Sequence, residues 1–188
     1  SPSPFESCTW ETRELSDFVA NYLGPKIKAF DPMVSIWVHD GQKGILPEEG
    51  YDYFLSDAKN FINGVAFHWY LTPPPVPGCE LVCTGAFESI DAMHEFVNDE
   101  NVIFVGTEAC TGFDDIESPP NRGVSLGNMN RGQQYAEDII GDLNVNASSW
   151  NDWNIALDVT GGPNHVGNVV DAPIIIDVDK NVYYKQPM

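Results

Sequence analysis

The sequence predicts an α/β fold built as half of a (β/α)8 TIM barrel, and three observations lead to this fold class. Short, nearly unbroken apolar runs alternate along the chain with segments of helical periodicity. Such runs are typical of parallel strands that helices cover on their outer face. Polar and aromatic residues follow each run, as they do at the end of a barrel where active sites lie. The chain holds four such strand segments, half of the eight that close a barrel.

The sequence of the first half of the chain predicts one helix, followed by two units that each consist of a strand and a helix. Apolar residues recur at helical spacing over residues 11–22, and Gly24-Pro25 ends this periodicity. Unbroken apolar runs predict the strands, and amphipathic spacing predicts the helices. The expected elements are a helix over 11–22, a strand over 33–38, a helix over 52–61, a strand over 64–70 and a helix over 90–97.

The second half predicts two more strands and one more helix. A strand over 102–107 is followed by a long, turn-rich loop, a helix over 131–143 and a strand over 148–154. The apolar face of this helix is expected to hold Tyr135, Ile139, Ile140 and Leu143. The tail is β-like and has no closing helix. We therefore expect the barrel unit to span residues 1–171 and a truncated β-like segment that leads out of it to span 172–188.

Composition narrows the class of protein. The chain has 188 residues, which is enough for one globular core, and a net charge of −19, which repels nucleic acid and anionic surfaces. The acid surplus suits an acidic compartment. No apolar stretch is long enough to cross a bilayer. The chain begins with neither a methionine nor a secretion signal, so we expect it to be an excerpt of a longer protein.

Four cysteines and one sequon bear on the compartment. Cys79 and Cys83 are either paired or unlinked, whereas Cys8 and Cys110 are expected to be buried free thiols. Asn146-Ala147-Ser148 permits N-glycosylation at Asn146 in a secretory compartment. The histidines show no close ligand spacing, and we expect neither a metal nor an organic cofactor.

Glu108 is the strongest catalytic candidate from the residues alone. It stands where the third apolar run stops and a loop begins, which faces it toward the active-site end of a barrel. Aromatic faces that pack on sugar C–H groups, and carboxylates and amides that bind hydroxyls, would converge on the same rim. These residues follow the other strands: His39 and Asp40, His68, Trp69 and Tyr70, and Asp152, Trp153 and Asn154. Core packing is the alternative for the tryptophans, and Trp153 is the best candidate to face a ligand.

A glycosidase needs a second carboxyl group beside its nucleophile. Asp40 and Asp152 are the internal candidates, although a turn aspartate at 40 and a backbone brace at 152 explain them equally. A different chemistry is suggested by the G-x-S-x-G pattern around Ser125. It lacks the preceding strand and the directly following helix that a serine nucleophile requires.

Ordered motifs resemble the lysosomal acid β-glucosidases, or glucosylceramidases, of glycoside hydrolase family 30. They span nearly the whole chain. They are Val65-Ala66-Phe67-His68-Trp69-Tyr70-Leu71, Glu108-Ala109-Cys110-Thr111-Gly112, Arg131-Gly132-Gln133-Gln134-Tyr135, Trp150-Asn151-Asp152-Trp153-Asn154, Gly161-Gly162-Pro163-Asn164 and Tyr184-Lys185-Gln186-Pro187-Met188.

The resemblance implies a retaining β-glucosidase of which this chain is a partial (β/α)8 barrel, roughly strands 5 to 8, with Glu108 on the seventh strand as nucleophile. The family's acid/base glutamate lies in an Asn-Glu-Pro motif at the end of the fourth strand, and its place is shortly before Ser1. Phe5 and Tyr70 resemble residues at the pocket mouth, and His68 a residue beside the catalytic pair. Trp153 and Asn168 resemble glucose-contacting residues. Tryptophan, usual in the family, is replaced here at Met129 and His165.

The same resemblance implies a substrate, partners and a compartment. Glucosylceramide or another β-glucoside would be hydrolysed, with a saposin-like activator and a membrane surface as possible partners, in the lysosome or after secretion. The missing N-terminal half of the barrel would complete the site, and the chain alone would be unstable and inactive. The rival hypothesis is a truncated, non-catalytic relative that binds sugar or an activator protein. Nucleic acid is not expected as a partner.

Overall fold

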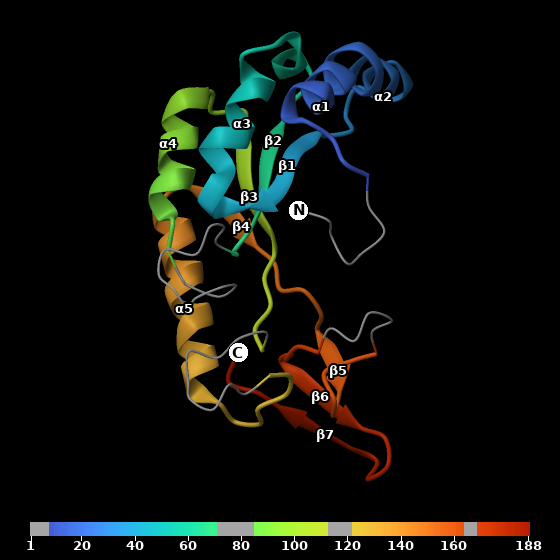
Figure 1. Cartoon of the computed structure of the whole chain (residues 1–188), viewed down its shortest axis with the longest axis vertical. Helices are drawn as coiled ribbons and strands as arrows, with labels where there is room; N and C mark the ends of the chain where they lie inside the picture. Colours follow the sequence, from blue (N-terminus) through green and yellow to red (C-terminus); the bar gives the residue numbers. More distant parts are fainter. Residues whose placement is uncertain (1–7, 71–84, 113–121, 164–168) are drawn as a thin grey trace.

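The computed structural model describes residues 8–70, 85–112, 122–163 and 169–188. Two sheets organise these residues (Figure 1). The larger is parallel, in the order β1 (Trp37–Gln42), β2 (Gly64–His68), β3 (Ile103–Glu108) and β4 (Ala147–Trp150). The smaller consists of β5 (Ala156–Asp158), β6 (Ile174–Asp177) and β7 (Val182–Lys185). The predicted α/β fold with neighbouring parallel strands, consistent with a partial barrel, is confirmed.

Helices connect and cover the parallel strands, as right-handed βα units require. α3 (Leu46–Phe54) and α4 (Phe87–Val97) lie beside each other against the sheet (Figure 1). The core between them and the strands is fully apolar: Leu46, Val65, Phe67, Ile90, Met93, Val102, Phe104 and Ala147. α5 (Met129–Asn144) precedes β4. No helix in the described part of the chain is long and apolar enough to cross a membrane.

The expected end of the first helix at Gly24-Pro25 is wrong. The chain stays helical from α1 (Thr12–Phe18) through a π-helical turn (Val19–Leu23) into α2 (Gly24–Phe30). Pro25 lies just after the π-helical turn, where the backbone hydrogen-bond pattern already changes and the chain stays helical without its N–H. Gly24 is packed against Phe61, whose ring would lie 2.4 Å from an added Cβ. The glycine therefore serves close packing and does not stop the helix.

The next two boundaries also differ from expectation. β1 begins at Trp37 and extends to Gln42, so the predicted strand over 33–38 starts too early. Met33 and Val34 are exposed, and parallel pairing begins where Trp37 meets Gly64. The helix expected over 52–61 is instead α3, which begins at Leu46, followed by a 3-10 turn (Asp57–Asn60). Pro47 in the first turn marks the real start, because proline is favoured there.

The face of α5 that was expected to be buried is only partly buried. Tyr135 is buried as expected and Ile139 is half-buried, but Ile140 and Leu143 are 60% and 51% exposed. The buried positions beside Tyr135 are instead charged: Arg131, Asp138 and Asp142. Lys43, in a 3-10 turn (Lys43–Ile45) after β1, donates hydrogen bonds to Asp138 and, at 3.0 Å, to Asp142. Charge on this face is tolerated because it is paired and hydrogen-bonded. Apolar periodicity alone therefore located Tyr135 correctly but missed the charged residues that share its buried face.

The smaller sheet follows β4 and includes a strand that was not predicted. β5 pairs in parallel with β6, and β6 pairs antiparallel with β7, which accounts for the β-like tail. β5 lies on the N-terminal side of residue 172, and the predicted domain boundary there stays a prediction. Cys110 is a buried free thiol as expected, but Cys8 is exposed. The possible pair Cys79 and Cys83 lies outside the described residues.

Candidate active site

The carboxyl ends of β1, β2 and β3 bring three polar side chains into one row. Gln42 pairs with His68, and His68 pairs with Glu108, which is the last residue of β3. The register shifts beside His68, and Trp69 N–H donates to the Glu108 carbonyl at 3.1 Å. The backbone around Glu108 is thus held by its neighbouring strand, while its side chain remains 32% exposed. The Glu108 carboxylate can therefore contact a ligand while the backbone that carries it stays fixed in the sheet.

His68 stands between two carboxylates. Its Nδ1 lies 3.8 Å from Glu108 Oε1, and its Nε2 lies 3.3 Å from Asp40 Oδ1. Thr107 Oγ donates to the same Asp40 oxygen at 2.6 Å. The hydrogen bond from His68, more than any other contact, holds the pKa of Asp40 below its usual value. Asp40 is therefore ionised and accepts hydrogen bonds, so it holds His68 in place and is not a proton donor.

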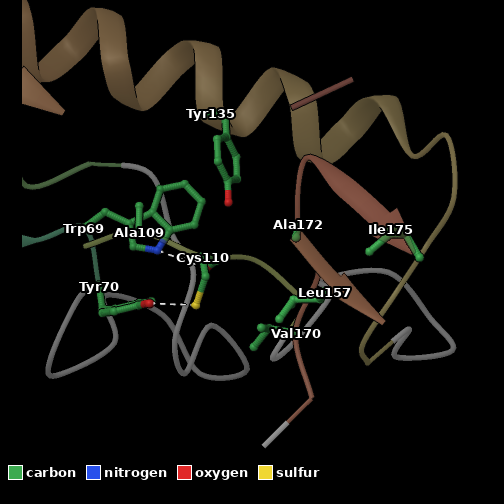
Figure 2. Close-up of a cluster of buried hydrophobic side chains, with 9 residues drawn as sticks. All are labelled: Trp69, Tyr70, Ala109, Cys110, Tyr135, Leu157, Val170, Ala172 and Ile175. Atoms are coloured by element: carbon green, nitrogen blue, oxygen red, sulfur yellow. Dashed lines mark hydrogen bonds between the residues drawn. The ribbon is translucent and has the colours of Figure 1, made fainter. Parts of the chain in front are cut away.

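Tyr70 and Cys110 are buried next to Glu108 and contact each other. Figure 2 shows the Tyr70 hydroxyl directed at the Cys110 sulfur, 2.8 Å away, and the Trp69 indole N–H donating to the Cys110 carbonyl. Burial and the neighbouring Cys110 and Glu108 raise the pKa of Tyr70. Burial raises the pKa of the Cys110 thiol to about 12. Both groups therefore stay neutral, and the tyrosine can act as a hydrogen-bond donor next to the carboxylate.

The loop after β4 brings the backbone of Trp153 to the same rim. Its backbone N–H donates to the Ala109 carbonyl at 2.7 Å, directly after Glu108 in the chain, and the residue is 37% exposed. Its neighbour Asp152 accepts a hydrogen bond from the Tyr135 hydroxyl at 3.0 Å. Burial raises the pKa of Asp152 to about 6. Trp153 therefore offers an open aromatic surface, whereas Asp152 is tied to α5.

A buried cluster joins this rim to the smaller sheet. Trp69, Tyr70 and Cys110 pack with residues of α5, β5 and β6 (Figure 2). Trp69 meets the rings of Tyr135 and Trp150 edge-on, at 5.0 and 6.1 Å between centroids. Such packing fixes the backbone that carries the polar side chains.

Comparison with known proteins decides the family. A model of the glycosyl hydrolase family 30 TIM-barrel domain matches residues 1–188. This chain belongs to glycosyl hydrolase family 30. Its sequence is 35% identical over 187 residues to putative glucosylceramidase 3 of Caenorhabditis elegans and 34% identical over 187 residues to the lysosomal acid glucosylceramidase of Mus musculus. Each match covers 98% of this chain and 33% of the relative. The chain thus spans about a third of the length of these relatives.

Solved structures of related folds agree with this assignment. SrfJ from Salmonella typhimurium matches with a TM-score of 0.76 at 27% identity, over 97% of this chain and 36% of that one. The endo-β1,6-glucanase BT3312 matches with a TM-score of 0.71 at 21% identity, over 95% of this chain and 37% of that one. The second likeness supports the fold only. Both matches agree in fold with this chain over most of its length, and the barrel itself comes from the family model.

Within this family 30 chain, the structure gathers four of the predicted site residues: Glu108, His68, Tyr70 and Trp153. Phe5, Asn168 and His165 lie outside the described residues. Sequence reasoning missed Thr107 and Cys110, although both flank Glu108 closely in the chain. Their contacts with Asp40 and Tyr70 depend on strand register, which the sequence did not reveal.

The remaining predicted sites have separate outcomes. No cluster of metal-binding side chains occurs in the described ranges. Ser125 precedes α5 by several residues, the described residues directly before it (122–124) form no strand, and its N–H donates to Asp171 Oδ2 at 3.1 Å. This geometry does not fit a serine nucleophile. Asn146 is exposed at the turn between α5 and β4, with a φ of 70°, and its glycosylation stays a prediction.

Proposed function

We propose that this family 30 chain contributes the nucleophile-bearing half of a retaining β-glucosidase that hydrolyses glucosylceramide to glucose and ceramide. The observation that carries the proposal is the placement of Glu108 at the end of β3, with His68, Tyr70 and Trp153 around it. The names of the glucosylceramidases to which the chain is similar support the substrate. Their lysosomal member supports lysosomal residence.

In the proposed reaction, Glu108 attacks the anomeric carbon of the glucoside and forms a glycosyl ester. A second carboxyl group protonates the leaving oxygen, and the alcohol, ceramide, departs. The same group then removes a proton from water, which releases glucose and restores Glu108. Trp153 is proposed to pack on the apolar face of the sugar, and Tyr70 to donate a hydrogen bond at the Glu108 carboxylate. Phe5 and Asn168 are proposed as further sugar contacts.

The second carboxyl group is proposed to lie outside residues 1–188. Asp40 is ionised by its hydrogen bonds, so it cannot protonate a leaving group in the resting site. Asp152 is hydrogen-bonded to Tyr135 on α5. No Asn-Glu-Pro motif occurs in the sequence. We therefore propose that additional strands complete both the barrel and the catalytic pair, with residues 1–171 as the barrel unit and 172–188 leading out of it.

An activator protein and a membrane surface are proposed partners, because a ceramide substrate is embedded in lipid. The acid surplus of the chain suits such a setting only at low pH, where protonation of carboxylates reduces repulsion from anionic lipid. Vesicles that contain phosphatidylserine should therefore raise turnover at pH 5 more than at pH 7, whereas neutral vesicles should not.

A mechanism-based inactivator tests the nucleophile. In the full-length protein, a 2-deoxy-2-fluoro β-glucoside with a good leaving group should leave a stable ester, located by peptide mass spectrometry at Glu108. Glu108→Gln should abolish both the label and glucoside hydrolysis, by roughly 10⁴-fold or more. Labelling at a different residue would contradict the assignment. Glucose binding by calorimetry with neither label nor turnover would favour the rival, a sugar-binding relative without activity.

A further inference from the structure

We infer that Asp40 is a positioning residue for the nucleophile, acting through His68. The inference rests on the proposed function of Glu108 and deepens it. His68 is held between Asp40 and Glu108, and it is the connection between them. Asp40 does not touch the reacting atoms.

The backbone at the end of β1 is shaped to present Asp40. His39 and Asp40 have φ values of 75° and 52°, in the left-handed region that non-glycine residues rarely adopt. The register with β2 shifts between His39 and Gly41 at the same point. Conformations of this kind are strained and persist where the surrounding structure demands them. Here they allow the Asp40 carboxylate to contact both β2 and β3.

Two donors fix the same Asp40 oxygen. Thr107 Oγ, on β3, donates to Oδ1 at 2.6 Å, and His68 Nε2, on β2, lies 3.3 Å from it. The lowered pKa of Asp40 keeps it an anion, which can only accept hydrogen bonds. His68 must therefore carry a proton on Nε2. This contact fixes both the tautomer and the orientation of the ring, which leaves Nδ1 facing Glu108.

The fixed ring keeps the same edge toward Glu108 throughout the reaction. His68 Nδ1 lies 3.8 Å from Glu108 Oε1, which is too long for a hydrogen bond. His68 therefore stands beside the nucleophile without bonding to it, and the contact with Asp40 sets its place. When Glu108 becomes a glycosyl ester and loses its charge, Asp40 still holds the ring in the same orientation.

The expected effect is moderate. The Asp40 side chain is 64% exposed, so solvent screens its charge. Misplacing a catalytic group by about 1 Å costs up to 10²-fold in rate. We expect Asp40→Ala to lower kcat for an aryl β-glucoside by roughly tenfold. Asp40→Asn, which keeps an acceptor oxygen, should lie between the wild type and Asp40→Ala, and Thr107→Val should lose about threefold.

The test uses the full-length protein, in which glucoside turnover by the wild type can be measured. Binding of deoxynojirimycin, a glucose-shaped competitive inhibitor, should change less than twofold in Asp40→Ala while kcat falls. The ¹⁵N resonances of His68 should report a proton on Nε2 in the wild type and a tautomer mixture in Asp40→Ala. Glu49→Gln is the matched control, because Glu49 lies 3.5 Å from the neighbouring His39 and should leave kcat unchanged.

Wild-type kcat in Asp40→Ala would overturn the inference, as would an unchanged His68 tautomer. Equal losses of inhibitor affinity and kcat, together with a lower melting temperature, would show a structural role instead and overturn it too. Failure of the proposed function looks different, because the wild-type protein itself would then show no label at Glu108. The His68 resonances of the free protein still test the Asp40 contact in that case.

Discussion

Two regions of this molecule gather titratable side chains, and they differ in how far water reaches these side chains. At the rim, Asp40, His68 and Glu108 form a row of titratable side chains that are 64%, 21% and 32% exposed. Lys43, Asp138 and Asp142 form a second cluster, here called the buried charge cluster, in which every side chain is 0% exposed. Water can adjust the charges at the rim, but it cannot reach those of the buried charge cluster.

The difference teaches what each region can do. A partly solvated row can change its protonation and pairing during a reaction at low cost. The buried charge cluster is confined by the Phe87 ring, 4.6 Å from Lys43 Nζ, and by the Trp150 indole, which donates to Asp138 at 2.9 Å. It links the 3-10 turn after β1 to α5 and β4; Asp40 lies within β1, just before this turn, and Trp153 follows β4. Its role is to hold these elements in place.

Breaking the buried charge cluster should give the largest effect on stability. Lys43→Met removes the cation and leaves two buried carboxylates without a counter-charge, which costs about 3–5 kcal/mol. The free energy of unfolding from urea titration at pH 7 measures this loss. Lys180→Met is the matched control, because Lys180 is 70% exposed where it pairs with Asp177, and should cost at most ~1 kcal/mol. Similar losses in both variants would contradict the comparison.

The sequence predicted the strand ends at the rim but not the buried charge cluster. The parallel strands and the placement of Glu108 at a strand end followed from apolar runs and from where they stop. Ordered motifs predicted the family. The buried charge cluster was not predicted, because Lys43 is far from Asp138 and Asp142 in sequence and charge on a helix ordinarily indicates a solvated face. The Asp40 contacts were hidden for a related reason, since they depend on a bulge and on register.

At the rim, an exposed aromatic ring should affect binding rather than folding. Trp153→Ala should raise KM and the dissociation constant of deoxynojirimycin by roughly tenfold, the value of a good aromatic contact. The melting temperature should hardly change, because the ring is 37% exposed. Trp10→Ala serves as control, since Trp10 is 48% exposed beside Phe18 on α1. Unchanged sugar affinity in Trp153→Ala would remove this residue from the site.

The smallest expected effect is a pH-dependent change in the free energy of unfolding caused by Asp142 in the buried charge cluster. Burial raises the pKa of Asp142 to about 7, against about 3.9 in the unfolded chain. The folded protein therefore binds this proton more tightly, so the stability it contributes is fully present below about pH 4 and is lost as pH rises through 7. Asp142→Asn removes this loss.

We expect Asp142→Asn to be more stable than the wild type by about 1–2 kcal/mol at pH 7.5, an advantage that shrinks toward pH 5. Urea unfolding of both proteins across this range gives the difference directly, and titrating groups that do not interact with Asp142 cancel in it. A difference that stays constant with pH would mean that Asp142 is ionised throughout. Lys43 would then balance two full negative charges, and the buried charge cluster would carry a net charge of its own.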